Sequence, residues 1–183
     1  MPNLYWPERR PGRRRERRLR LQAWQAAESA ARKVLLVTHA ECLDGVGAAI
    51  VTLRALGPDQ VGVLYARPDE MAEVLDHVVR SPGQGRRLLI ADLSLQKPDY
   101  PRIVAACSAL RAGGWRVEWR DHHHKQWEGL DLRRLRREVA VLEVEAQESG
   151  ASLQQRALAP QDGLLADLAR CIRDRDLWLN RDP

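Results

Sequence analysis

Three consecutive histidines follow an aspartate at Asp121-His122-His123-His124, in a chain that has five histidines in total. Imidazole is among the commonest metal ligands in proteins, and a cluster of such rings is costly to bury in an apolar core. The preceding residues 115–120 (WRVEWR) have the β-branched and aromatic composition of a short strand. We therefore expect the histidines at the carboxyl end of a strand, where open α/β sheets gather their ligands. A solvated histidine-rich turn is the alternative interpretation.

Other residues that could bind a metal also follow predicted strands. His39 and Asp44 come after the apolar run of residues 33–38, and Asp92 ends the run of residues 87–91. Parallel strands place their carboxyl ends at one edge of a sheet, so these side chains are expected to converge there. Imidazole and carboxylate together suit a divalent ion such as manganese, and several carboxylates suit a pair of ions. Asp44 or Asp92 alone could instead cap a helix or turn.

The elements that must position these residues alternate between short apolar runs and helical patterns. The predicted strands are residues 33–38, 61–65, 87–91 and 115–120, with a candidate fifth strand at residues 139–144. The predicted helices are residues 43–56, 69–80 and 100–112, followed by a largely helical stretch over residues 149–179 with a break at residues 160–163. Strands that alternate with helices over short connections predict an α/β fold with a doubly wound, mostly parallel sheet.

Charge is distributed unevenly along the 183 residues, whose formal net charge is +5. Residues 1–20 hold eight arginines and two glutamates, a local charge of +6, whereas the remainder holds 22 basic and 23 acidic residues. An apolar stripe at helical spacing over residues 16–32 predicts a basic helix. We therefore divide the chain into an arginine-rich arm with its helix, residues 1–32, and a domain over residues 33–183. The arm could contact nucleic acid through counterion release, or serve only as a solubilising or partner-binding tail.

Composition bears on the class of protein and its compartment. No apolar run approaches the length of a membrane span, and the first twenty residues are rich in arginine rather than apolar. We therefore expect a protein without membrane association and with a cytoplasmic location. Cys42, Cys107 and Cys171 are odd in number and widely spaced, without a C-x-x-C pair. Reduced thiols are expected, rather than a disulfide framework or a structural zinc site.

Four motifs in order resemble those of the DHH phosphoesterase superfamily, in particular its RecJ-like and oligonucleotide-nuclease branch. The residues that are similar to its first, second, third and fourth motifs are 38–45 (THAECLDG), 90–94 (IADLS), 121–123 (DHH) and 174–178 (DRDLW). Residues 148–151 (ESGA) also resemble a segment common in the nuclease-like branch. A single motif of this kind is weak, but four that fall in order, three of them on predicted strand ends, are more specific.

The resemblance implies a metal-dependent phosphodiester hydrolase that acts on short oligonucleotides or small nucleotides. It implies two manganese ions, with magnesium as the alternative, and Asp92 as the bridge between them. His123 would contact the substrate phosphate, and Asp121 would orient a histidine. In the fourth motif, Asp176 is preferred to Asp174 as the ligand. The metal ligands that the resemblance implies are His39, Glu41, Asp44, Asp92, His122, Asp174 and Asp176.

Departures from the family pattern favour a second hypothesis. Glu41 stands where the family usually has aspartate, and His124 leaves open which two histidines are the working pair. The family normally carries a C-terminal DHH-associated domain, and its glycine-rich, histidine-containing loop has no counterpart in this sequence. The alternative is a catalytically impaired DHH domain that acts as a nucleic-acid-binding or assembly module. A homo-oligomer or a partner subunit is a further expectation, and Trp178 is expected to pack and to position Asp176.

Overall fold

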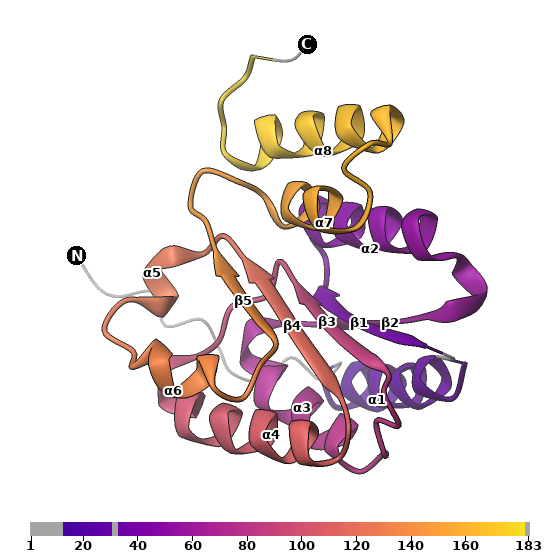
Figure 1. Ribbon diagram of the computed structural model, residues 1–183, viewed down its shortest axis with the longest axis vertical. Coiled ribbons are helices and arrows are strands. Elements are labelled where there is room, and N and C mark those ends of the chain that lie inside the picture. The colour runs from indigo at the N-terminus through magenta and orange to yellow at the C-terminus, as the bar shows by residue number, and fades with distance from the viewer. Residues whose placement is uncertain (1–12, 31–32, 182–183) are drawn as a thin grey trace.

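A five-stranded sheet with helices on both faces forms the protein in the computed structural model, which describes residues 13–30 and 33–181 (Figure 1). Every neighbouring pair of strands is parallel, and the order across the sheet is β2-β1-β3-β4-β5. The predicted doubly wound α/β fold is therefore confirmed. The strands are β1 (Val34–His39), β2 (Val61–Ala66), β3 (Arg87–Ala91), β4 (Arg116–Asp121) and β5 (Val141–Val144).

The predicted helices agree with the observed ones to within a few residues, and the short helices α5 and α6 were not predicted. The observed helices are α1 (Arg13–Ala30), α2 (Leu43–Leu56), α3 (Met71–Val79), α4 (Tyr100–Ala112), α5 (His124–Trp127), α6 (Leu132–Arg136), α7 (Gly150–Leu158) and α8 (Gly163–Asp176). The predicted helix over residues 69–80 begins as a 3-10 turn, Pro68–Glu70. Trp115 precedes β4 instead of joining it, because its backbone N–H donates to the carbonyl of Leu110 at the end of α4.

Both faces of the sheet are buried, which explains why residues 34–37 of β1 and 88–91 of β3 are continuous apolar runs. Leu35 and Val37 of β1 pack in one cluster with α1, α3 and α4, whereas Val34 and Leu36 pack in another with α2 and α7. Successive side chains of a strand point to opposite faces, so a strand segment covered by helices on both faces buries consecutive side chains and is mostly apolar. Helix α8 lies outside α2 and α7 as a further layer (Figure 1).

The strand order creates a switch point between β1 and β3. From β1 the chain crosses to β2 on one side, and then returns to β3 on the other side of β1. The connections that leave the carboxyl ends of these two strands therefore run to opposite faces of the sheet. Open α/β sheets bind ligands in the crevice that this divergence leaves.

Helix α1 is anchored on the domain through Trp24. The indole of Trp24 is buried, and its Nε1–H donates to the backbone carbonyl of Tyr65 in β2, with 2.9 Å between the atoms. The helix begins at Arg13, three residues before its predicted start, and the first twelve residues of the arm lie outside the described residues. Among the described residues, no helix is both long and apolar enough to cross a membrane.

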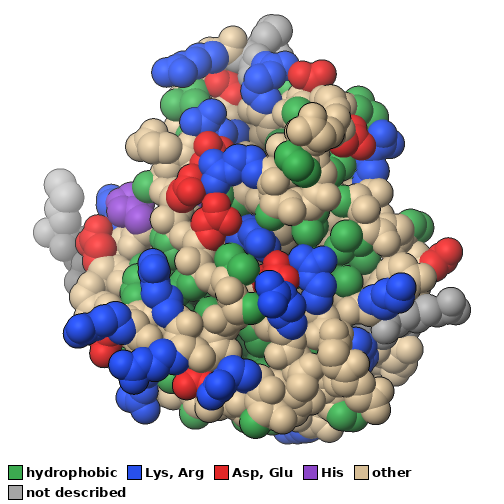
Figure 2. All heavy atoms as spheres, viewed as in Figure 1, with side chains coloured by type: hydrophobic (Ala, Val, Ile, Leu, Met, Phe, Trp, Pro, Cys, Tyr) green, Lys and Arg blue, Asp and Glu red, His purple; other side chains and the backbone are tan. Residues whose placement is uncertain are grey.

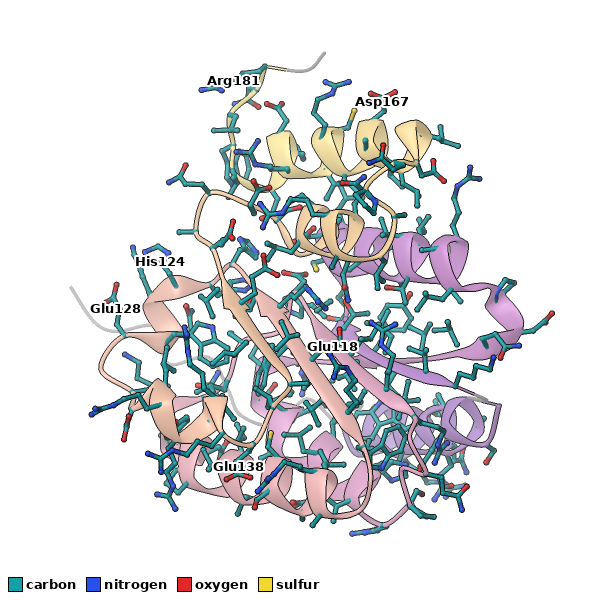
Figure 3. The ribbon with its side chains drawn as sticks, viewed as in Figure 1. Glu118, His124, Glu128, Glu138, Asp167 and Arg181 are labelled. Carbon is teal, nitrogen blue, oxygen red and sulfur yellow. The ribbon has the colours of Figure 1, made fainter. Side chains whose placement is uncertain are left out.

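A buried carboxylate joins three arginines in the middle of the sheet. Glu118 of β4 has 4% of its side chain exposed and accepts both Nε–H and Nη2–H of Arg87 at 3.0 Å (Figure 3). It also accepts from Arg116 at 3.1 Å and from the buried Arg120 at 3.2 Å. Arg120 reaches Glu143 on β5, with 3.2 Å between Nε and Oε2. Figure 2 shows acidic and basic side chains interspersed on the face of the molecule that is viewed in Figure 1.

We expect Glu118→Gln to lower the free energy of unfolding by about 3 kcal/mol, because the buried Arg120 loses one of its two carboxylate partners and keeps Glu143 as the other. Burial alone would raise the pKa of Glu118, but Arg87, Arg116 and Arg120 outweigh it and hold the pKa below its usual range. This stabilisation is therefore present above the usual glutamate pKa and is lost as the pH falls through the lowered one.

Urea unfolding of the wild type and of Glu118→Gln, at neutral and at acidic pH, measures this effect. The difference between them should shrink as the pH falls. Asp167→Asn is the control, since Asp167 pairs with Arg170 on the exposed face of α8 (Figure 3) and should change stability by no more than about 0.5 kcal/mol. Equal stability of Glu118→Gln and the wild type at neutral pH would contradict the assigned role.

Candidate metal centre

The carboxyl ends of the strands, next to the switch point between β1 and β3, bring together imidazole and carboxylate groups from five elements. His39 ends β1, Asp92 directly follows β3, and Asp121 ends β4. Helices α2 and α8 contribute Asp44 from a first turn and Asp176 from a last residue. The predicted site residues that the structure gathers at this edge are His39, Asp44, Asp92, Asp121, His122, His123 and Asp176.

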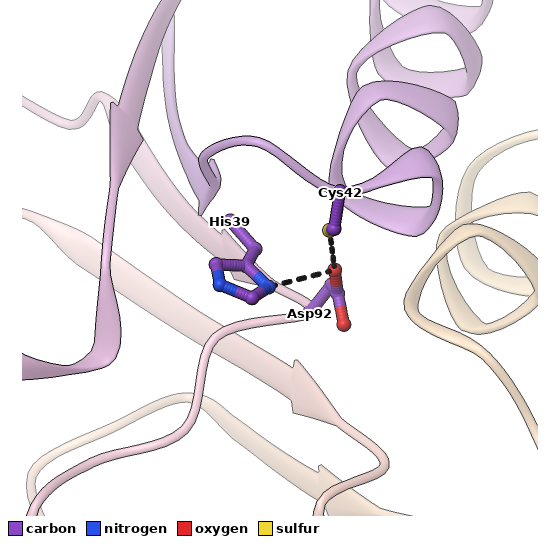
Figure 4. A group of neighbouring side chains, drawn as sticks. All are labelled: His39, Cys42 and Asp92. Carbon is purple, nitrogen blue, oxygen red and sulfur yellow. Dashed lines mark hydrogen bonds and ion pairs between the residues drawn. The ribbon is translucent and has the colours of Figure 1, made fainter. Parts of the chain in front are cut away.

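Asp92 is the centre of this arrangement, because its two carboxylate oxygens face different partners. Its Oδ1 lies 3.2 Å from Nε2 of His122. Its Oδ2 lies 3.7 Å from Nδ1 of His39 and 3.0 Å from Sγ of Cys42 (Figure 4). The residue is buried and has a φ of 52°, a left-handed conformation that aspartate tolerates better than most residues. The fold therefore holds this carboxylate in place between two groups of donors.

One group of donors is formed by Asp44, His122 and Asp176. Nε2 of His122 lies 3.5 Å from Oδ2 of Asp176 and 3.7 Å from Oδ2 of Asp44. The carboxylate of Asp44 accepts the backbone N–H groups of Gly150 and Ala151 at the start of α7, with 2.8 Å to the second nitrogen. The positive end of a helix dipole holds an anion well in this position. These three side chains offer ligand atoms that all lie within 4.8 Å of one another.

A second group of donors is formed by His39, Cys42 and Asp92, whose ligand atoms also lie within 4.8 Å of one another. Cys42 caps the amino terminus of α2, where its Sγ accepts the backbone N–H of Gly45 at 3.1 Å. From the sequence we expect Cys42 only to be a reduced thiol. Cys42 is therefore a candidate ligand that the sequence prediction missed. The signal that could have revealed it is its position three residues after His39, at the start of a predicted helix.

His123 is oriented by Asp121. Its Nδ1 lies 2.7 Å from Oδ1 of Asp121, and the other oxygen of that fully buried carboxylate accepts the indole N–H of Trp127 at 2.7 Å. Burial lowers the pKa of His123, but the hydrogen bond and charge of Asp121 outweigh this and raise it. With Nδ1 engaged, Nε2 of the partly exposed ring is the nitrogen left to meet a ligand.

Protons held by Asp44 and His122 offset the negative charge of the neighbouring carboxylates in this cluster. Burial, followed by the charge of Asp92, raises the pKa of Asp44 to about 7. Burial would lower the pKa of His122, but Asp92 and then Asp176 raise it to about 9. Burial likewise acts to raise the pKa of Asp92, yet its hydrogen bonds with His122, His39 and Cys42 hold it far below the usual range. A divalent cation could supply the positive charge that these protons supply.

Two predicted ligands lie outside these groups. Glu41 is exposed, with a φ of 66° in the turn between β1 and α2, and is absent from the donor groups found among the described residues. Both carboxylate oxygens of Asp174 accept the backbone N–H of Arg181, at 2.8 and 3.0 Å. Asp174 therefore fastens the segment after α8, and Asp176 is the aspartate of this motif that reaches the cluster.

The solvent exposure of His124 and of Trp178 decides two further expectations. His124 is exposed on α5 at the edge of the molecule (Figure 3), so His122 and His123 are the histidines at the cluster. The expectation that Trp178 packs is wrong, because its side chain is 70% exposed. The guanidinium of Arg175 lies 4.7 Å from the centre of its ring and covers part of it. Trp178 therefore does not position Asp176 by packing.

No known protein family matches the sequence, and no curated protein matches it either. The fold is similar to a solved structure described as an uncharacterized protein from Helicobacter pylori G27, with a TM-score of 0.62 and 14% sequence identity. The alignment covers 82% of this chain and 45% of that one, so this chain spans less than half of the other's length. At this identity the likeness shows a shared fold alone.

Proposed function

We propose that the protein is a divalent-metal-dependent phosphodiester hydrolase of the DHH type, acting on short oligonucleotides or small nucleotides. The observation that supports this most is the division of the Asp92 carboxylate, with one oxygen toward His122 and the other toward His39. A carboxylate placed in this way can bridge two ions. Manganese is the proposed ion, with magnesium as the alternative. A cytoplasmic location is part of the proposal and agrees with three free cysteine thiols.

The donor set fits such a centre. Asp44, His122 and Asp176 offer two carboxylates and an imidazole, which are ligands that manganese accepts. When bound, two ions would supply Lewis acidity at the scissile phosphate. The chain's own groups would hold the substrate and keep the ligands oriented. The amino terminus of α7 fixes Asp44, and the buried position of Asp92 limits its movement.

His123 is the residue we assign to the substrate phosphate. Its Nδ1 is committed to Asp121, so Nε2 can donate to a phosphate oxygen. Trp127 holds Asp121 from the other side, which limits rotation of the carboxylate and hence of the ring. A charge-assisted hydrogen bond of this kind orients a phosphodiester and stabilises the charge that develops on it in the transition state.

Hydrolysis of a defined substrate panel in the presence of manganese tests the proposal. The panel contains a short RNA, a short DNA, a cyclic dinucleotide and pyrophosphate. We expect cleavage of at least one phosphodiester, and loss of that cleavage when a chelator removes the metal. Failure to hydrolyse any of them, with manganese shown to be bound, would contradict the enzymatic function.

His123→Ala should reduce turnover by about 100-fold or more while sparing the metal, because the residue acts on the substrate in this proposal. The control is His124→Ala, which removes the adjacent histidine that points into solvent. Its turnover should equal that of the wild type. Manganese content and initial rates measured on both variants check the prediction. Loss of manganese in His123→Ala would instead make that residue a ligand.

A second candidate function is a nucleic-acid-binding module, and the charge of the arm favours it. Residues 1–20 carry a local charge of +6, and α1, which includes residues 13–20, is anchored on the domain through Trp24. Arginines neutralise phosphates and release counterions. Such an arm would therefore hold a nucleic-acid strand near the candidate metal centre. This role is compatible with the enzyme and would also suit a domain that has lost activity.

Deletion of residues 1–20 should weaken binding to single-stranded oligonucleotides and flatten its salt dependence, by a slope of about 0.7 for each phosphate that the arm had neutralised. Hydrolysis of a dinucleotide should barely change, since the donor groups lie elsewhere and Trp24 is retained. Fluorescence anisotropy over a range of salt concentrations measures the slope. Equal slopes with and without the segment would exclude the arm as a phosphate-binding element.

A further inference from the structure

The donors around His39 differ in kind from those around His122. Beside His39 lie the thiol of Cys42 and one oxygen of Asp92, with 3.0 Å between Sγ and Oδ2 (Figure 4). Beside His122 lie the carboxylates of Asp44 and Asp176, together with Oδ1 of Asp92 and the ring of His123. One side of the centre therefore offers nitrogen and sulfur with a shared carboxylate, and the other offers mostly oxygen.

Carboxylates that could replace the thiol do not reach His39. Glu41 is exposed in the turn before α2. Asp44 is turned to the start of α7, where Gly150 and Ala151 donate to it, and its ligand atom groups with His122 instead. Among the described residues, Cys42 and Asp92 are thus the acidic groups whose ligand atoms cluster with the imidazole of His39.

A helix cap does not by itself account for the cysteine. Cys42 Sγ accepts the backbone N–H of Gly45, but the residues that serve best at this position are serine, threonine, aspartate and asparagine. Sulfur is a weak acceptor in comparison. The side chain is also aimed at Asp92, which an ordinary cap does not require.

We propose that the centre is asymmetric, with His39, Cys42 and Asp92 holding a thiophilic divalent ion such as zinc, and Asp44, His122 and Asp176 holding a harder ion such as manganese. This inference rests on the two-ion centre of the proposed function. Thiolate and imidazole select zinc, cobalt or iron, whereas carboxylate-rich sites accept manganese and magnesium. Binding breaks the S–H bond of Cys42, forms a metal–sulfur bond and releases one proton to solvent. Oδ2 of Asp92, which had accepted that proton's hydrogen bond, is then available as a ligand.

Cobalt(II) is the probe for this site, because a thiolate ligand gives it an intense charge-transfer band in the near ultraviolet. The protein is freed of metal with a chelator and titrated with cobalt under reducing conditions. We expect the band in the wild type and its loss in Cys42→Ser. Serine keeps an acceptor at the cap of α2, so the fold is retained. Weaker cobalt d–d bands from the remaining ligands should persist in this variant.

Cys171→Ser is the matched control, because Cys171 is an exposed thiol on the last helix and should leave the band unchanged. Zinc and manganese offered together, followed by elemental analysis, should give one of each in the wild type. Cobalt binding without a charge-transfer band would overturn the role of Cys42 and leave the two-ion centre standing. A protein that binds none of cobalt, zinc or manganese would overturn the centre itself.

Discussion

Asp92→Asn should abolish the binding of both ions and lower hydrolysis by roughly 1000-fold, which is about 4 kcal/mol of transition-state stabilisation. The amide replaces one carboxylate oxygen with a group that cannot ligate a cation, and it removes the negative charge that both donor groups share. Oδ2 of Asp92 belongs to the donor group of His39 and Cys42, and Oδ1 lies 3.2 Å from His122 of the other group, so one group loses a member and the other loses the carboxylate beside it. Loss of one residue therefore affects two sites.

The ratio of manganese and zinc to protein, measured by elemental analysis after dialysis, is the direct readout. Asp174→Asn is the control, since Asp174 belongs to the same sequence motif as Asp176 but holds the backbone of Arg181. That variant should lose some stability and keep its metal. Thermal unfolding of both variants separates loss of the ions from loss of the fold. Unchanged metal content in Asp92→Asn would eliminate the proposed bridge.

The fold was predictable because its strands are buried on both faces. Residues 34–37 and 88–91 are apolar throughout, as expected of strand segments buried between two helical layers, and they form the centres of β1 and β3. Polar residues just past such runs must emerge at one edge, and this is where His39, Asp92 and Asp121 lie. The order of the strands was beyond prediction, since alternation along the chain does not say on which side of β1 the third strand pairs.

Details of the site depended on geometry that residue types do not carry. Glu41 and Cys42 are neighbours, and the left-handed turn at Glu41 directs only Cys42 toward Asp92. Asp174 and Asp176 are two positions apart on α8, which places them on nearly opposite sides of a helix with 3.6 residues per turn. A motif names both aspartates, but the packing of α8 decides which one reaches His122.

Gly150→Ala should cost the protein both stability and metal, because α7 begins in direct contact with Asp92. A Cβ at Gly150 would lie 2.3 Å from Cβ of Asp92 and 2.8 Å from its Cα, distances at which the backbone must move. We expect a loss of about 1–3 kcal/mol in the free energy of unfolding, as for other overpacked cores. The shift would also disturb the N–H that Gly150 donates to Asp44, so the affinity for metal should fall as well.

Gly163→Ala makes the same change at the equivalent position, the first residue of α8, where an added Cβ meets nothing within 4 Å. This variant should match the wild type in metal content and gain about 0.4–1 kcal/mol in stability, because alanine restricts the unfolded chain more than glycine does. The same Gly→Ala change is thus expected to lower the free energy of unfolding at the start of α7 and to raise it at the start of α8. Urea unfolding with and without manganese measures both. If Gly150→Ala binds its ions as tightly as the wild type does, the contact between the start of α7 and Asp92 is not what positions the Asp92 carboxylate.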